Sequence, residues 1–248
     1  MNYPNYKNKH LEKSLFSPHD FFNYVNIKKI KNLPKKYILI FDNRCFKYLK
    51  KKYSKDFKNL ASITSGKVFV SQNLGFVKVN GIGAPNAVIV MEELIELGGK
   101  EFIILGMAGG LRNFGLYVCN KAIRDEGTSH HYIKLGKYSY PNKNLTQKLE
   151  SILKDNSIGY KKGTTWTIDA PYRETKKEIL YYKKEGVVTV EMEASALFIV
   201  AKVRKVKAAA AFIVSDVLGE KKWDPQFDSK KVCNSLNKLV EVVIKNLI

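Results

Sequence analysis

Two apolar runs decide the fold: Val187-Val188-Thr189-Val190, which passes directly into Glu191-Met192-Glu193-Ala194, and Ala208-Ala209-Ala210-Ala211-Phe212-Ile213-Val214. A short continuous apolar run is typical of a strand that is buried on both faces. Between these runs, a helix is expected to start near Met192 and to end near Arg204. A buried strand, a helix and a second buried strand in succession indicate a layered α/β fold.

The rest of the chain continues this alternation of strands and helices. The expected strands cover residues 37–41, 68–70, 76–79, 102–105 and 163–167, and the expected helices cover residues 45–53, 87–97, 145–156 and 236–247. Because several strands are apolar on both faces, we expect a mixed, largely buried sheet. One α/β domain is predicted to span residues 1–248, with residues 1–16 as a candidate flexible N-terminal arm.

The chain carries a formal net charge of +20, which would suit a polyanionic partner. However, the lysines are scattered in pairs such as Lys35-Lys36 and Lys161-Lys162, and no nucleic-acid recognition motif accompanies them. We therefore interpret the charge as a solvated surface and do not expect nucleic acid as a partner. A mild attraction of anionic substrates is a further interpretation.

The cysteines and the N-terminus indicate the compartment. Cys45, Cys119 and Cys233 are odd in number and lack the spacing of metal ligands, so no metal is expected. No segment resembles a signal peptide, and no apolar run approaches the roughly 20 residues that span a bilayer. These features favour a reduced, cytoplasmic setting without a membrane partner.

Three carboxylates stand at the ends of the two deciding strands. Glu191 and Glu193 follow the first strand, and Asp216 follows the second. Side chains at strand ends of α/β folds converge on a crevice where ligands bind. The structural alternative for Glu191 and Glu193 is a first helical turn, where negative charge is favoured by roughly 0.3–1 kcal/mol. The residues alone leave both interpretations open.

Several motifs in a fixed order resemble the trimeric and hexameric nucleoside phosphorylases and their related nucleosidases. The motifs are Gly81-Ile82-Gly83-Ala84-Pro85-Asn86, Gly106-Met107-Ala108-Gly109-Gly110-Leu111, Arg124-Asp125-Glu126-Gly127-Thr128-Ser129, Val190-Glu191-Met192-Glu193-Ala194 and Ile213-Val214-Ser215-Asp216. The resemblance spans residues 17–245 and implies a three-layer fold with a partly barrel-like central sheet flanked by helices. It also implies cleavage of a nucleoside at its N-glycosidic bond.

The resemblance assigns the sugar and the leaving base to particular residues. Glu193 would accept hydrogen bonds from the ribose 2′- and 3′-hydroxyls, with Met192 and Glu191 beside it. Asp216 would be the general acid that protonates the base, and its presence favours a purine because uridine phosphorylases generally lack this Asp. His19 in Ser17-Pro18-His19 would reach the ribose of a neighbouring subunit, which implies a homo-oligomer, either a dimer or a hexamer built as a trimer of dimers.

The base pocket is expected among Trp166, Tyr172, Arg173 and Ser215. The aromatic rings of Trp166 and Tyr172 would stack on the base, and Arg173 would read an exocyclic oxygen. Their alternatives are a core tryptophan and a surface arginine. For His19 the alternative is an isolated surface histidine.

The phosphate side departs from the family pattern. The residues assigned to a phosphate or water site are Asp42, Arg44, Gly83, Gly106, Met107, Ala108 and Arg124. The segment Phe41-Asp42-Asn43-Arg44-Cys45-Phe46 lacks the family's glycine loop, Ile104 replaces a phosphate-binding arginine, and Met107 replaces a hydroxyl residue.

Two reactions follow from this departure. The nominal one is phosphorolysis, with inorganic phosphate as co-substrate, no cofactor, and base and ribose 1-phosphate as products. In the alternative, water replaces phosphate and a carboxylate such as Asp42 activates it. Uridine phosphorolysis and a non-catalytic nucleoside- or RNA-binding protein are the remaining alternatives.

Overall fold

A five-stranded barrel forms the centre of the computed structural model, which describes residues 3–26, 32–60, 63–219 and 222–248. The barrel strands run in the order β5 (Glu101–Gly110), β9 (Val187–Glu191), β8 (Lys161–Ile168), β6 (Leu116–Asp125) and β10 (Lys207–Leu218). Strand β10 pairs with β6 on one edge and with β5 on the other, which closes the ring. Parallel and antiparallel neighbours both occur, so the sheet is mixed.

The sheet continues outside the barrel as an open arm. Strand β1 (Lys36–Ile40) lies parallel to both β5 and β4 (Leu74–Val79), and β3 and β2 follow as antiparallel strands. Residues Tyr37 to Ile40 of β1 are buried on both faces of the sheet. The remaining strands are β2 (Lys58–Asn59), β3 (Gly66–Val70), β7 (Tyr138–Ser139) and β11 (Trp223–Pro225).

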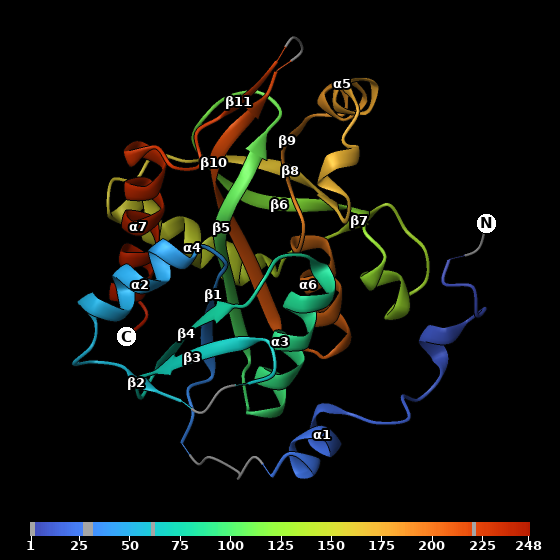
Figure 1. The fold of residues 1–248 in the computed structure, drawn as a ribbon, viewed down its shortest axis with the longest axis vertical. Helices are drawn as coiled ribbons and strands as arrows, with labels where there is room; N and C mark the ends of the chain where they lie inside the picture. The colour runs from blue at the N-terminus through green and yellow to red at the C-terminus, as the bar shows by residue number, and fades with distance from the viewer. Residues whose placement is uncertain (1–2, 27–31, 61–62, 220–221) are drawn as a thin grey trace.

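Helices cover both faces of this sheet (Figure 1). One apolar cluster joins the sheet to α2 (Asn43–Lys52), α4 (Lys143–Asp155) and α7 (Lys230–Lys245). A second cluster joins its other face to α3 (Ala84–Glu96) and α6 (Ala194–Val203). The result is the three-layer α/β arrangement with a barrel-like sheet that the sequence predicts.

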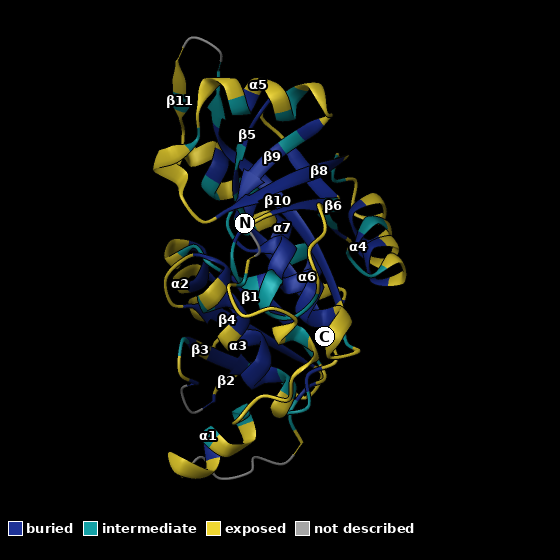
Figure 2. Ribbon diagram, turned by 90° about the vertical axis from the view of Figure 1, so that its right-hand side faces the viewer, coloured by how far each residue is buried: buried dark blue, intermediate teal, exposed yellow. Residues whose placement is uncertain are grey.

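The smaller elements lie at the periphery. Helix α1 (Pro18–Tyr24) packs against α3, and α5 (Lys176–Lys184) lies near the end of the barrel (Figures 1 and 2). Figure 2 shows the barrel strands and α6 as buried, whereas α1 and α5 are largely exposed. Short 3-10 helices, η1, η2 and η3, cover Lys9–Leu11, Thr128–His131 and Pro171–Arg173.

The N-terminal arm contacts the body of the protein. In its described part, which excludes residues 1–2, the Tyr3 hydroxyl lies 3.0 Å from His131 Nε2 and Lys9 Nζ lies 2.9 Å from His131 Nδ1. No helix in the described part of the chain is long and apolar enough to cross a membrane.

Two barrel segments are among those that differ from the sequence expectation. The strand expected at residues 102–105 extends through the glycine-rich residues 106–110, because β9 and β10 supply ladder partners on both edges. Strand β6 is absent from the expectation because Asn120 and Lys121 interrupt its apolar run, and a bulge in its pairing with β8 falls between Cys119 and Lys121.

Candidate active site

A cavity of about 660 Å³ opens where β1, β5, β9 and β10 reach their C-terminal ends. Because the strand ends leave the apolar core here, polar side chains from distant parts of the sequence converge. The residues that line the cavity are Phe41, Asp42, Ile82, Gly106, Met107, Ala108, Gly109, Pro171, Tyr172, Glu174, Val190, Glu191, Met192, Glu193, Phe212, Ser215, Asp216, Leu218, Trp223 and Phe227.

Glu193 is held by the main chain of the loop before α3. Gly83 adopts φ +97°, a left-handed conformation that favours glycine, and its N–H donates to Glu193 Oε1 at 2.7 Å. The N–H of Met192 donates to Oε2 at 3.3 Å. Burial raises the pKa of Glu193, while these two backbone donors act in the opposite direction. The carboxyl group is therefore fixed in position at the cavity wall.

Glu191 anchors the start of α6. Its Oε2 accepts from the N–H groups of Glu193 at 2.8 Å and Ala194 at 2.7 Å, and its Oε1 accepts from the Thr167 hydroxyl at 2.5 Å. Burial, and then the neighbouring Glu193, raise the pKa of Glu191. Glu191 therefore fits the alternative of a carboxylate at the first turn of a helix. Its side chain accepts hydrogen bonds from backbone N–H groups at the start of α6 and positions Glu193.

A β-bulge aims Ser215 and Asp216 at the cavity. The register of β10 against β5 shifts between Val214 and Asp216, which turns this pair of side chains toward the strand end. Asp216 Oδ1 accepts from the Ser215 hydroxyl at 2.8 Å, and Oδ2 accepts from Trp223 Nε1 at 2.7 Å. A Cβ at Gly109 would lie 2.9 Å from Val190 and 3.4 Å from Asp216 Oδ2, so this position needs a glycine.

Glu174 is a cavity residue that the sequence reasoning missed. It follows η3, lines the same cavity as Asp216, and has no side-chain hydrogen bond within the described part of the chain. Burial, together with the negative charges of Asp216 and Glu178, raises the pKa of Glu174 to about 7. The sequence could have pointed to Glu174 in one way. This residue lies in the segment 164–175, where the family resemblance places base contacts.

Asp42 lines the cavity just after the end of β1. Asp42 Oδ1 accepts from the Cys45 N–H at 2.7 Å and caps α2, and Oδ2 accepts from Arg44 at 3.0 Å. Arg44 also contacts Asp228 and donates to the Phe227 carbonyl at 2.9 Å. The guanidinium thus ties α2 to the segment before α7, and Arg44 does not line the cavity.

Lys78 is a buried cation close to Asp42. Its amino group donates to the Val79 carbonyl. Burial lowers the pKa of Lys78, and the charge of Asp42 partly opposes this effect. Lys78 lies outside the cavity lining.

Two residues that were expected to bind ligand are instead structural. Trp166 is fully buried, donates from Nε1 to Asp125 Oδ2 at 2.9 Å and packs on Tyr182, so the core alternative is correct for it. Arg124 is buried and donates to Ser129 Oγ at 2.9 Å and to the Lys134 carbonyl at 3.1 Å, away from the cavity.

Two further expected ligands also lie outside the cavity of their own subunit. Arg173 is exposed and does not line it. His19 Nδ1 lies 2.9 Å from Glu96 Oε1, at the far end of α3 from Gly83. A helix of 13 residues is about 20 Å long. In contrast, Tyr172 and Ser215 do line the cavity, and Tyr172 is fully exposed at its edge.

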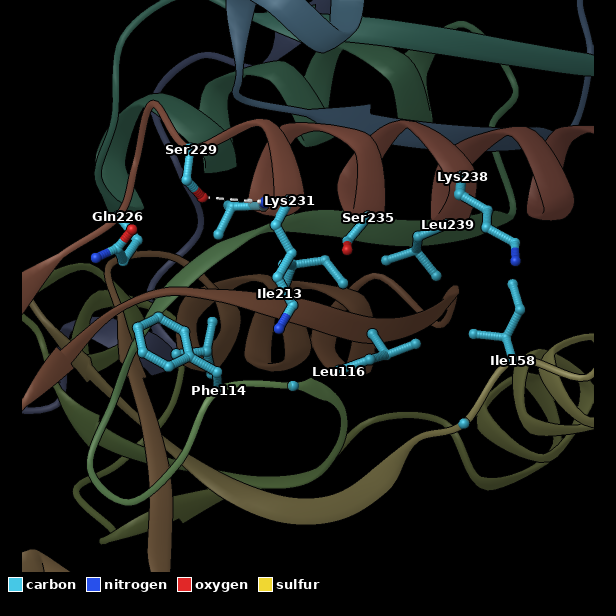
Figure 3. Close-up of a pocket in the computed structure, with 14 residues that line it drawn as sticks. Phe114, Leu116, Ile158, Ile213, Gln226, Ser229, Lys231, Ser235, Lys238 and Leu239 are labelled. Atoms are coloured by element: carbon cyan, nitrogen blue, oxygen red, sulfur yellow. Dashed lines mark hydrogen bonds between the residues drawn. The ribbon is translucent and has the colours of Figure 1, made fainter.

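A second cavity, of about 410 Å³, lies on the other side of β10 beneath α7 (Figure 3). Phe114, Leu116, Ile213 and Leu239 give it an apolar wall, and Lys231 extends into it (Figure 3). None of its lining residues is a carboxylate, so it lacks side chains for general acid–base catalysis. Carboxyl groups gather instead in the first cavity. No cluster in the described residues has the His, Cys, Asp and Glu content of a metal site.

Comparison with solved structures agrees with this fold. The structure superposes with a TM-score of 0.77 on purine nucleoside phosphorylase from Toxoplasma gondii in complex with immucillin-H, at 20% identity over 87% of this chain and 90% of that one. It superposes with a TM-score of 0.73 on AMP nucleosidase from Bacteroides thetaiotaomicron, at 20% identity over 93% of this chain and 100% of that one. The fold is thus one that nucleoside-cleaving enzymes share.

Sequence comparison gives the family. A profile of the phosphorylase superfamily matches residues 35–247, so the chain belongs to this superfamily. It is 25% identical over 216 residues to a purine nucleoside phosphorylase of Buchnera aphidicola, covering 82% of this chain and 89% of that protein. It is 29% identical over 153 residues to a uridine phosphorylase of Treponema pallidum, covering 56% of this chain and 59% of the relative.

Proposed function

We propose that this protein hydrolyses the N-glycosidic bond of a purine nucleoside, with water as the nucleophile. The observation that carries the proposal is the acidic composition of the cavity wall. Its described lining contains five carboxyl side chains and no lysine or arginine. The carboxyl groups belong to Asp42, Glu174, Glu191, Glu193 and Asp216.

Such a wall disfavours inorganic phosphate. Phosphate sites in proteins use cationic side chains or clusters of free backbone donors. Here Ile104 is fully buried in the core, Met107 lines the cavity, and the Gly83 N–H is already bonded to Glu193. Water needs no cation and is activated by a carboxylate, so these residues support hydrolysis over the phosphorolysis that is nominal for the family.

The sugar would lie against Glu193 and Met192. The Glu193 carboxylate, fixed by the Gly83 N–H, accepts the ribose hydroxyls and holds the sugar in one orientation. As the C–N bond breaks, the sugar gains oxocarbenium character, which a negatively charged wall stabilises. The raised pKa of Glu193 means that the ribose hydroxyls bind to the carboxylate best above neutral pH.

The proton and the water would approach from opposite sides of β5. Strand β10, which carries Asp216, pairs with one edge of β5, and β1, which leads to Asp42, pairs with the other. The base, beside Asp216, takes the C–N electron pair and a proton. Water beside Asp42 attacks the anomeric carbon and gives its proton to that carboxylate, which yields free base and ribose.

Phosphorolysis is the second candidate, and Lys78 is the observation that favours it. This buried amino group lies near enough to Asp42 for the Asp42 charge to raise its pKa, and Arg44 donates a hydrogen bond to Asp42. A rearrangement that released both cations from their present partners would create an anion site at the nucleophile end. Uridine cleavage is less favoured because Asp216 supplies an acid suited to a purine.

Incubation of adenosine, inosine, guanosine and uridine with and without phosphate separates these reactions. We expect purine release at the same rate in both conditions, with ribose as the sugar product and, in ¹⁸O-water, one labelled oxygen at the anomeric carbon. Formation of ribose 1-phosphate would overturn hydrolysis. Release of no base from any nucleoside would leave the binding alternatives, and a salt-dependent gel shift tests RNA.

His19 remains a proposed ligand of a neighbouring subunit's ribose. The length of α3 separates it from the cavity of its own chain, so the role requires a homo-oligomer. Sedimentation of the full chain tests this requirement, and we expect a dimer or a hexamer. A monomer at assay concentration would contradict the role of His19.

A further inference from the structure

The base end of the cavity contains two carboxyl groups in unequal environments. Both oxygens of Asp216 accept hydrogen bonds, from the Ser215 hydroxyl and from Trp223 Nε1. Such donors favour the charged form of a carboxyl group. Glu174 lines the same cavity, is half-buried, and has no side-chain hydrogen bond within the described residues. The proton-binding partner of this pair is therefore Glu174.

The charges around Glu174 reinforce this difference. The groups that act on it are Asp216 on β10 and Glu178 on α5, and both are carboxylates. Together with burial they raise the pKa of Glu174 to about 7. Near neutral pH the pair therefore carries about one proton, which is how two close carboxyl groups behave when their environments differ.

We infer that Glu174 and Asp216 form a one-proton carboxyl pair that recognises a 6-aminopurine and supplies the proton for its departure. This inference rests on the proposed nucleoside cleavage and names its substrate class. One neutral carboxyl group donates a hydrogen bond, and one carboxylate accepts one. A 6-aminopurine presents the matching edge, because ring nitrogen N7 accepts and the exocyclic amino group donates.

A 6-oxopurine lacks this match. Its N7 and O6 are both acceptors, so one of them would face the ionised carboxylate without a proton between them. When the wrong substrate leaves buried polar groups of a site without hydrogen-bond partners, the site discriminates strongly against that substrate. The pair therefore selects adenosine-type nucleosides over inosine-type nucleosides, and the preference is largest when only one proton is present.

The proton balance of the step is complete. The C–N bond breaks with its electron pair on the base, and the proton of the carboxyl pair moves to the ring nitrogen. Water forms the new C–O bond and gives its proton to Asp42. After the base leaves, Glu174, which is partly exposed, regains a proton from solvent. Glu174 is thus a catalytic residue in addition to Asp216.

The test compares wild type, Glu174→Gln and the matched control Glu178→Gln with adenosine and inosine between pH 5.5 and 9. Glutamine still satisfies the capping box that Glu178 forms with Thr175, and Glu178 does not line the cavity. We expect wild-type kcat/KM to favour adenosine at least tenfold. It should fall above about pH 7, because the pair then loses its proton, and also in acid, because Glu193 then loses the charge that accepts the ribose hydroxyls.

Glu174→Gln should lower kcat/KM for adenosine at pH 6 by about 100-fold and remove the fall above pH 7. Glu178→Gln should keep most of the wild-type kcat/KM at pH 6 and should still show the fall, displaced to lower pH because one of the negative charges that raise the pKa of Glu174 is gone. An unchanged rate and pH profile in Glu174→Gln, or a wild-type preference for inosine, would overturn the inference.

Binding of the free bases tests the pair without cleavage. Calorimetry of wild type with adenine and with hypoxanthine at pH 7, in buffers of different ionisation enthalpy, needs no variant to fold. We expect adenine to bind at least tenfold more tightly. Equal affinities would overturn the pair even if nucleosides are cleaved, whereas adenine selectivity without any base release would overturn only the proposed hydrolysis.

Discussion

The proposed sugar end and the proposed base end of the cavity are built from different kinds of hydrogen-bond donor. At the sugar end, Glu191 and Glu193 accept chiefly from backbone N–H groups of the segments that begin α3 and α6. At the base end, Asp216 accepts from two side chains, the Ser215 hydroxyl and the Trp223 indole. Backbone donors belong to the fold itself, whereas side-chain donors change with a single substitution.

This difference indicates which end carries specificity. A sugar is common to all nucleosides, so its site gains from rigid donors that hold one orientation. Bases differ in their donors and acceptors, and the base end uses exchangeable side chains from η3 and β11 to read them. Substitutions at the base end should therefore change selectivity, and those at the sugar end should change the rate for all nucleosides alike.

Replacement of Asp216 by Asn should cause the largest loss. The variant keeps the shape of the side chain but removes the negative partner of Glu174, so the base loses its positioned proton source. We expect kcat for adenosine to fall by about 10²–10⁴-fold, as for loss of a general acid. Steady-state kinetics at pH 6 measures this, and a loss below tenfold would remove Asp216 from the chemistry.

Replacement of Glu193 by Gln should cost about 100-fold in kcat/KM for every purine nucleoside. The amide keeps one oxygen for the Gly83 N–H but no longer offers a charge to the ribose hydroxyls or to the developing oxocarbenium ion. The adenosine-to-inosine ratio should stay constant. A change in that ratio would show that the two ends are not separate, which contradicts the comparison.

The sequence places Glu191, Met192 and Glu193 at the cavity because they lie in one strand-to-helix connection, and their role toward a sugar stays a prediction. Glu191, Met192 and Glu193 are contiguous, and the burial of the preceding strand already places them at a sheet edge. The layered α/β fold follows for the same reason, since β9, α6 and β10 are adjacent in the chain and largely apolar, whereas the barrel-like closure of the sheet was implied only by the family resemblance.

The base end could not be predicted in the same way. Trp223 reaches Asp216 through the pairing of β11 with β10, and Glu174 follows a 3-10 helix, so neither position has a hydrophobic period that marks it. For Trp166 the sequence predicts a ligand contact that the structure does not show. An aromatic residue in this segment suggests stacking on the base, but the alternation of side chains along the strand turns Trp166 into the core, where its N–H donates to Asp125.

Replacement of Trp223 by Phe should have a moderate effect, confined to the base end. Phenylalanine retains a ring but removes the donor to Asp216 Oδ2, a charge-assisted hydrogen bond in a half-exposed position. We expect about a tenfold fall in kcat/KM for adenosine and a smaller adenosine-to-inosine ratio. Trp223→His keeps a ring N–H and should recover part of the kcat/KM for adenosine and part of the adenosine-to-inosine ratio. If it recovers neither, the loss in Trp223→Phe results from altered packing and not from the missing hydrogen bond.

Replacement of Glu191 by Gln should have the smallest effect on activity and should be visible mainly in stability. Glu191 is buried, and its raised pKa means that the folded protein keeps a proton that the unfolded chain releases above its ordinary pKa. Stability that depends on this proton is present in acid and is lost as pH rises toward 8.

Glu191→Gln should therefore flatten the fall in unfolding free energy between pH 5 and pH 8, by at most about 1.4 kcal/mol per pH unit for one proton. Urea unfolding at each pH measures the slope. Glu185→Gln is the matched control, because Lys137 lowers the pKa of Glu185 and its titration lies below this range. An equal slope in wild type and Glu191→Gln would show that Glu191 is ionised when folded. The charges of Glu191 and Glu193 would then be held by backbone N–H groups and the Thr167 hydroxyl.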